Sequence, residues 1–298
     1  LILSNNSYSK EILIKFKVHD AIITNLDIEN EKKYLILLNA NLKKLSPNDL
    51  ESLASNSLIR EIIKTTRVKE VFDISKEYNF VNSVEKNFYQ KLGMQSLSEF
   101  KSLIKSKELN YKLIRNKLKT ETLWNKLIYD KYKNSIKVDE NILKKKILET
   151  KANSKKKYEY NLYEILIELN ENETLSKKLE KIKRSVEKNG FENTANLYSI
   201  SESSNFGGEL GWIKETQLSN KIIKKLKKID KNEISDPINI PGGFLLLKYT
   251  EKKEIISKID INKEVEALKT YETNRQLNQF SIIYYKRLKQ NININEVE

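Results

Sequence analysis

The stretch 205-NFGGELGWIKETQLSNKIIKKL-226 is the most informative part of this chain, because it concentrates residues that are scarce elsewhere. The sequence has 7 glycines in 298 residues, and Gly207, Gly208 and Gly211 all fall here. Glycine is favoured where the backbone takes a positive φ angle or approaches another group closely. A tryptophan and a lysine-rich amphipathic run follow. The stretch therefore predicts a tight turn that leads into a helix over 218–228.

The composition excludes several classes of site. The chain has no cysteine, which rules out disulfides, thiolate catalysis and cysteine-based metal sites. It has a single histidine, His19, so a histidine-rich metal site is excluded as well. The glycines lack the following lysine and serine or threonine of a phosphate-binding loop. We therefore expect neither a metal nor another cofactor.

The charge pattern favours a general basic surface over a nucleic-acid site. The formal net charge is +14, but the lysines are dispersed along the chain and interleave with glutamates. A nucleic-acid binder remains an alternative that rests on charge alone, and strongly salt-dependent DNA binding would revive it. Dispersed positive charge can also attract acidic client proteins by electrostatic steering. We expect no nucleic-acid partner and, because no run of about eighteen apolar residues exists, no stable membrane insertion.

The first half of the chain is mostly helical in its pattern. Apolar and polar residues alternate from residue 11, which predicts a β-hairpin, and Thr24 followed by Asp27 predicts the start of a helix to about residue 39. Ser46 and Pro47 form a second helix start. Further helices are predicted over 67–79, 81–92, 96–106, 108–131 and about 139–150.

The second half mixes strands and helices. Residues 158–169 are rich in aromatic and β-branched side chains, which predicts a strand. Helices over about 173–189, 191–198 and 218–228 and a strand over 243–252 follow. A helix over 262–290 is long enough to stand apart from this block.

The residues 198-YSISESSNFGGELGW-212, followed by the amphipathic helix, a Ser-x-Pro step and a strand entered through Gly-Phe, resemble the parvulin family of peptidyl-prolyl isomerases, or rotamases. All these features occur in the family's order and at its intervals. The resemblance implies an FKBP-like β-α-α-α-β-β domain over 155–252.

The wider architecture resembles the SurA-like periplasmic chaperones, best at 11–39 and 158–252. This resemblance implies an α+β protein. Its mostly helical N-terminal domain, residues 1–150, would be completed by a C-terminal helix in 260–298, which packs back across the inserted parvulin-like domain. It also implies a periplasmic location.

Isomerisation has to lower a barrier of about 18–20 kcal/mol for rotation about the peptide bond. Active parvulins use two histidines and a cysteine or aspartate near the rotating carbonyl. The matching positions here are Glu164, Ser201 and Leu245, so all three depart from the family pattern. The resemblance therefore implies isomerase activity that is weak or absent, and whether the chain is an enzyme stays open. For Glu164, the alternative to a new catalytic acid is a strand residue tolerated at a decayed site.

The proline-pocket positions keep an apolar character. They fall on Leu218 and Ile222 in the predicted helix, with Phe244 and Trp212 nearby. The alternative is that these side chains are ordinary domain core.

The function that the resemblance implies is a periplasmic chaperone for unfolded outer-membrane protein segments or other exported polypeptides. Such a chaperone needs exposed apolar grooves, and we expect the main groove between the helical and parvulin-like domains. The alternative is a catalytically active prolyl isomerase that assists the folding of exported proteins.

Overall fold

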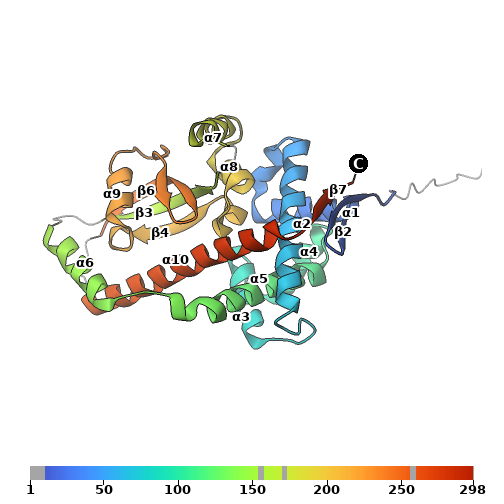
Figure 1. Cartoon of the computed structure of the whole chain (residues 1–298), viewed down its shortest axis with the longest axis horizontal. Helices are drawn as coiled ribbons and strands as arrows, with labels where there is room; N and C mark the ends of the chain where they lie inside the picture. Colours follow the sequence, from blue (N-terminus) through green and yellow to red (C-terminus); the bar gives the residue numbers. More distant parts are fainter. Residues whose placement is uncertain (1–10, 154–157, 170–172, 256–259, 298) are drawn as a thin grey trace, which may run out of the picture.

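The computed structural model describes residues 11–153, 158–169, 173–255 and 260–297. Figure 1 shows packed helices at one end, a sheet with its own helices at the other, and the long helix α10 running along both. The described residues combine many helices with two antiparallel sheets, which confirms the α+β prediction. The 154–157 and 256–259 segments, where the predicted domains would join, lie outside the described residues.

The chain enters the helical region through the predicted hairpin. Strands β1 (Ile14–Val18) and β2 (Ala21–Thr24) pair antiparallel, and β7 (Ile294–Glu296) pairs with the other edge of β1. His19 lies in the hairpin turn, and its backbone N–H donates to the carbonyl of Asn293 at 3.1 Å. The sequence predicts the hairpin but not the third strand, which joins segments more than 270 residues apart.

The two predicted helix starts are confirmed by their caps. The Thr24 hydroxyl accepts the N–H of Asp27, and the Asp27 carboxylate accepts the N–H of Thr24, at the start of α1 (Asn25–Leu38). Ser46 caps α2 (Pro47–Lys69) through its hydroxyl. A cap of this kind contributes about 1 kcal/mol. The local sequence therefore determines where both helices begin.

The helix predicted over 67–79 is wrong, because α2 ends within it and the chain continues as an irregular connection. The Asp73 carboxylate accepts hydrogen bonds from the N–H and the hydroxyl of Ser75, at 3.0 and 2.6 Å. Such local bonding competes with helical bonding. Phe72 and Ile74 still pack against the core, so their spacing reflects burial rather than a helix.

The other predicted helices of this region are confirmed to within a few residues. They are α3 (Asn79–Lys91), α4 (Leu97–Ser106), α5 (Tyr111–Tyr132) and α6 (Glu140–Asn153), with the short 3₁₀ turns η1 (Ala40–Lys44) and η2 (Lys133–Ser135).

Helix α10 (Ile261–Gln290) packs along the helical region through its whole length. Near its C-terminal end, the buried Trp124 of α5 donates from Nε1 to Ser281 Oγ at 2.8 Å and stacks on Tyr284. Its first turns share a separate apolar cluster with α6, made by Leu143, Ile147, Val265 and Leu268. These contacts are the ones expected if 1–150 and 260–298 form one unit, a division that stays a prediction.

The second region is built on a four-stranded antiparallel sheet. Its strand order is β4 (Glu209–Lys214), β3 (Tyr158–Ile167), β6 (Gly243–Glu254) and β5 (Ile238–Ile240). Strands β3 and β6 carry the longest ladder, which matches the two strands predicted here. The sequence does not predict β4 and β5, because β4 contains Gly211 and β5 has only three residues.

Helices cover both faces of this sheet. One face packs against α7 (Leu175–Asn189) and α8 (Phe191–Tyr198) through a cluster that includes Ile165, Ile167 and Leu246. The other face packs against α9 (Asn220–Leu226) through a cluster that includes Tyr160, Leu162, Leu166, Leu218, Leu245 and Leu247. Successive strand residues alternate between these two faces.

Candidate functional site

The glycine pair 207–208 positions the candidate site against strand β3. Gly207 and Gly208 have φ angles of 68° and 81°, in the left-handed region that favours glycine. A side-chain carbon on Gly208 would lie 2.2 Å from the backbone oxygen of Glu164. The Gly208 carbonyl accepts the N–H of Glu164 at 2.8 Å. The turn therefore needs glycine because its backbone lies directly against the residue at the first catalytic position of the family.

Glu164 and Ser201 lie together, as their family positions predict. One carboxylate oxygen of Glu164 accepts hydrogen bonds from Ser201 Oγ at 2.6 Å and Ser203 Oγ at 2.9 Å. The Ser203 hydroxyl also lies 3.1 Å from that of Ser201. Burial raises the pKa of Glu164, and the two hydroxyls oppose that shift. Ser203 is not predicted as a site residue, although its spacing of two residues from Ser201 is a signal that could have indicated it.

The third catalytic position of the family is apolar in this chain. Leu245 pairs with Leu166 across the ladder and lies in the cluster beneath α9, on the same sheet face as Glu164. His19 lies in the hairpin of the helical region, so no imidazole can act as a base for Ser201. The Glu164, Ser201 and Ser203 group can hold or donate a hydrogen bond, but it has no nucleophile paired with a base.

The four predicted pocket residues do not all face one place. Leu218 and Ile222 lie with Leu245 in the cluster on the α9 face. Phe244 packs into the cluster on the opposite face. Trp212 is 39% exposed, and the amine of Lys253 lies 3.9 Å from its ring centroid. A role of these residues in substrate binding stays a prediction, but only Leu218 and Ile222 adjoin the Glu164 face.

Helices α6 and α10 lie over the approach to α9. Lys146 of α6 donates to the backbone carbonyl of Leu218 at 2.9 Å. Glu264 of α10 forms an ion pair with Lys214 and accepts a hydrogen bond from Thr216 at 3.1 Å. Burial raises the pKa of Tyr271 in α10, and the charge of Glu164 adds to that shift. The sequence does not predict this cover, because it depends on how distant helices pack.

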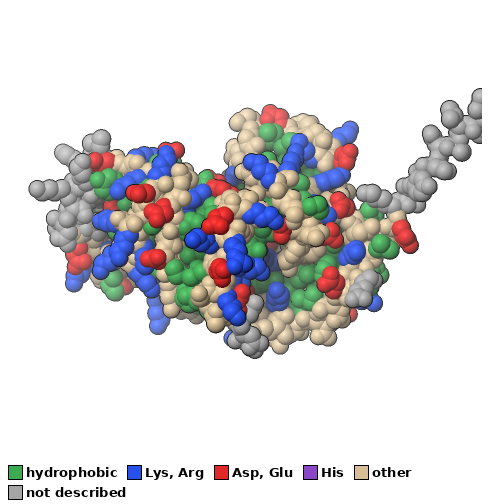
Figure 2. All heavy atoms as spheres, turned by 90° about the horizontal axis from the view of Figure 1, so that it is seen from above, with side chains coloured by type: hydrophobic (Ala, Val, Ile, Leu, Met, Phe, Trp, Pro, Cys, Tyr) green, Lys and Arg blue, Asp and Glu red, His purple; other side chains and the backbone are tan. Residues whose placement is uncertain are grey.

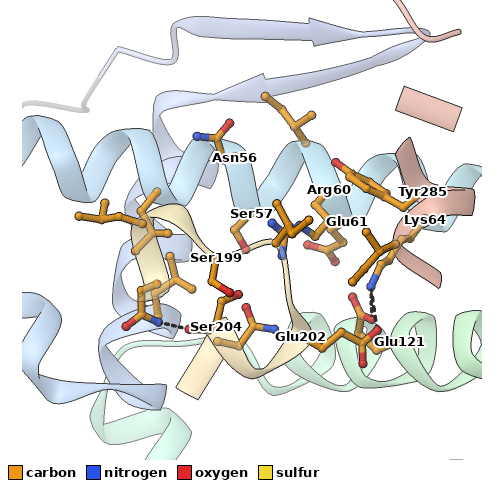
Figure 3. A pocket seen from close by; sticks show the side chains of 18 of the residues that line it. Asn56, Ser57, Arg60, Glu61, Lys64, Glu121, Ser199, Glu202, Ser204 and Tyr285 are labelled. Carbon is orange, nitrogen blue, oxygen red and sulfur yellow. Dashed lines mark hydrogen bonds and ion pairs between the residues drawn. The ribbon is translucent and has the colours of Figure 1, made fainter. Parts of the chain in front are cut away.

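A cavity of about 250 Å³ lies where the helical region meets the parvulin-like region. Figure 3 shows side chains from α2, α5 and α10 and from the 3₁₀ turn η3 (Glu202–Phe206) pointing into it. Lys64 of α2 lies 2.6 Å from a carboxylate oxygen of Glu121 and 3.7 Å from one of Glu202. Burial raises the pKa of Glu202. The cavity lies where we expected the main groove, but its lining is strongly charged.

The turn η3 and the residue before it connect the cavity with the Glu164 group. Ser201 and Ser203 bond Glu164, whereas Glu202 between them lines the cavity beside Lys64. The short segment from Ser201 to Ser203 therefore contacts both the Glu164 carboxylate and the cavity.

Glu164→Gln should stabilise the protein at neutral pH. Because burial raises the pKa of folded Glu164, the folded state binds this proton more tightly than the unfolded state does. The ionised carboxylate therefore lowers the free energy of unfolding above the folded pKa, and this effect vanishes below the unfolded pKa. Glutamine keeps an oxygen that accepts from both serines without the charge. Urea unfolding of both proteins from about pH 4 to about pH 8 measures the difference.

The stabilisation by glutamine should shrink as the pH falls. Glu187→Gln is the control, because Glu187 is an exposed residue of α7. A difference for Glu164→Gln that stays constant with pH, or that grows toward low pH, would contradict the burial argument.

Within the described residues, no helix combines the length and apolar character needed to cross a membrane. No group of three or more histidine, cysteine, aspartate or glutamate side chains in that part of the chain has a metal-binding arrangement.

Comparison with known proteins gives one family match and several relatives. Residues 164–251 match the family model described as Rotamase: PPIC-type PPIASE domain. The chain is 30% identical over 172 residues to Chaperone SurA of Pseudomonas putida, which covers 55% of this chain and 40% of that protein. It is 33% identical over 96 residues to Foldase protein PrsA of Bacillus subtilis, which covers 32% of this chain and 30% of that protein.

The chain thus spans less than half the length of both curated relatives. A solved structure from Campylobacter jejuni, reported under the description of two structurally related SurA-like chaperones, matches 96% of this chain and 99% of its own. Its sequence identity is 19% and the TM-score is 0.38.

Proposed function

From its place as a SurA-like protein with one parvulin-type domain, we propose that this chain is a chaperone for unfolded exported proteins. We further propose that it works in the periplasm, that its clients include outer-membrane protein segments, and that its prolyl isomerase activity is weak or absent. The observation that carries the proposal is the Glu164 site. A PPIC-type domain is present, but a carboxyl, two hydroxyls and Leu245 occupy its catalytic region.

The chemistry of the site supports binding more than catalysis. Isomerisation is accelerated when an enzyme stabilises the twisted amide better than the planar one. Here the apolar Leu218, Ile222 and Leu245 pack together on one face of the sheet, where Leu218 and Leu245 are buried, and the polar set of active parvulins is replaced. Helices α6 and α10 also contact the entry to α9.

The surface supports binding of unfolded segments. Several large apolar side chains are exposed, which is the property that a holding chaperone needs. In the helical region they include Ile22, Phe80, Val84, Leu97 and Leu113. Figure 2 shows lysine and arginine side chains scattered among acidic and hydrophobic ones on the face it presents, rather than gathered in one block. Such a surface suits polypeptide clients better than a nucleic-acid duplex.

The purified protein should suppress aggregation of a urea-unfolded porin diluted into buffer at a stoichiometric ratio. Light scattering measures the effect, and a basic protein of similar size without chaperone activity controls for the net charge of +14. Suppression that persists at high salt is expected if apolar contacts dominate. Scattering as strong as with the control protein would contradict the chaperone proposal.

An active prolyl isomerase is the second candidate. The match of 164–251 to the PPIC-type family favours it, as does the apolar patch of Leu218, Ile222 and Leu245. This candidate requires that Glu164 and its serine partners replace the polar groups of the family. Experiments can separate the two functions, because a chaperone can bind an unfolded client without catalysing isomerisation of its proline bonds.

A further inference from the structure

The helical region contains a second and larger cavity, of about 800 Å³, away from the Glu164 site. It is a groove lined by strand β2, helices α1 and α2, the connection after α2 and the first half of helix α5. Cavities of about 300–1,000 Å³ are the usual size for ligand sites. The groove is therefore large enough to accept several side chains of a bound segment.

The groove has apolar side chains that remain partly or largely exposed. Ile22 of β2 is 54% exposed and Leu113 of α5 is 51% exposed, and both line the groove. Leu58 and Ile62 of α2 add half-buried aliphatic surface between them. Burial of such surface by a ligand is worth about 25 cal/mol per Å². The walls thus favour aliphatic or aromatic side chains.

The ionisable side chains of the groove include two lysines without a carboxylate partner in the described residues. Three of its four carboxylates have cationic partners, because Lys117 pairs with both Glu31 and Glu61 and Glu77 pairs with Arg115 and Lys119, whereas Asp27 caps α1. Lys69 and Lys112 also line the groove, and neither has an ion-pair or hydrogen-bond partner for its amine among the described residues. The lining has five cationic and four anionic side chains and so a net charge of +1, and Lys69 and Lys112 are the cations whose amines are available to a ligand.

Two free amides complete the lining. The side chains of Asn30 and Asn116 are exposed in the groove and have no hydrogen-bond partner within the described part of the chain. An amide offers both a donor and an acceptor, which is what the backbone of an extended peptide requires. These contacts do not depend on the peptide's sequence.

We infer that this groove binds extended segments of unfolded polypeptide in which apolar side chains alternate with aspartate or glutamate. In an extended segment, successive side chains point to opposite sides, so one set can meet Ile22 and Leu113 while the other reaches Lys69 and Lys112. The inference rests on the proposed function and specifies its client class.

Labelled peptides test the inference by fluorescence anisotropy on the full chain. Three peptides of equal length alternate leucine with aspartate, glutamine or lysine. The aspartate peptide should bind about tenfold more tightly than the lysine peptide at low ionic strength, and the ratio should fall as salt is added. Equal binding of the aspartate and lysine peptides would overturn the inference.

Variants locate the site. Leu113→Asp should weaken binding of the aspartate peptide about tenfold, because it adds a like charge and removes apolar contact. Lys69→Glu with Lys112→Glu should remove or reverse the preference for the aspartate peptide. The matched controls are Ile142→Asp, at an exposed position of α6, and Lys183→Glu with Lys188→Glu on α7.

The controls should bind like the unaltered protein. Groove variants that bind like the unaltered protein, or controls that lose as much affinity as the groove variants, would overturn the inference. The proposed function is judged separately by suppression of porin aggregation. A protein that suppresses aggregation but does not discriminate among the peptides would keep the chaperone proposal and refute this one.

Discussion

Gly208→Ala should destabilise the protein by about 3 kcal/mol or more, whereas Gly211→Ala should cost about 1–2 kcal/mol. Both glycines have left-handed backbones, with φ angles of 81° and 73°. They therefore share the penalty that any side chain meets in that region. They differ in space, because a Cβ on Gly208 would lie 2.2 Å from Glu164 O and 3.0 Å from Ala195 Cβ, whereas one on Gly211 would meet nothing within 4 Å.

The difference between the stability losses of these two variants measures the effect of the close contact between the glycine turn and β3. Urea unfolding monitored by circular dichroism measures both midpoints. The Gly208 variant should also disturb the Glu164 group, since the carbonyl of Gly208 holds the N–H of that residue. Equal midpoints for the two variants would mean that the turn does not pack against the strand as described.

Trp124→Ala should destabilise the helical region by about 3–5 kcal/mol. Trp124 is fully buried, it hydrogen-bonds Ser281 of α10, and it stacks on Tyr284 at a ring-centroid distance of 5.6 Å. Its removal leaves a large cavity between α5 and α10 and an unpaired hydroxyl. The C-terminal half of α10 should then be cut more readily in limited proteolysis.

The other tryptophan of the chain supplies the matched control. Trp212 is 39% exposed and interacts mainly with the amine of Lys253. Trp212→Ala should therefore cost no more than about 1 kcal/mol. Similar losses of stability for the two tryptophan variants, or unchanged cleavage of α10 in the Trp124 variant, would contradict the proposed union of 260–298 with the N-terminal helices.

Local signals in the sequence predict much of this fold. Thr24 with Asp27 and Ser46 before a proline predict two helix starts, because the caps need only neighbouring residues. The helix over 67–79 is wrong because Asp73 bonds its own turn. Strands β4 and β7 escape prediction because their pairing depends on partners far along the chain, whereas β5 escapes because it has only three residues.

The candidate site is only partly predictable from the sequence, because part of it depends on tertiary packing. The motif order places Glu164 and Ser201 correctly relative to one another, and the structure joins them at 2.6 Å. Phe244 lies on the opposite sheet face from Leu245, because neighbouring strand residues alternate. The cover by α6 and α10 and the two cavities result from tertiary packing, which no local pattern encodes.

The central claim is that a parvulin fold persists here without the catalytic set of the family. A protease-coupled proline-peptide assay tests it most directly, because uncatalysed isomerisation takes about 10–100 s at 25 °C and any acceleration is readily seen. With an active parvulin as the positive control, we predict a rate close to the uncatalysed one. A rate well above it, abolished by Leu218→Ala with Ile222→Ala, would contradict the claim and identify the chain as an active isomerase.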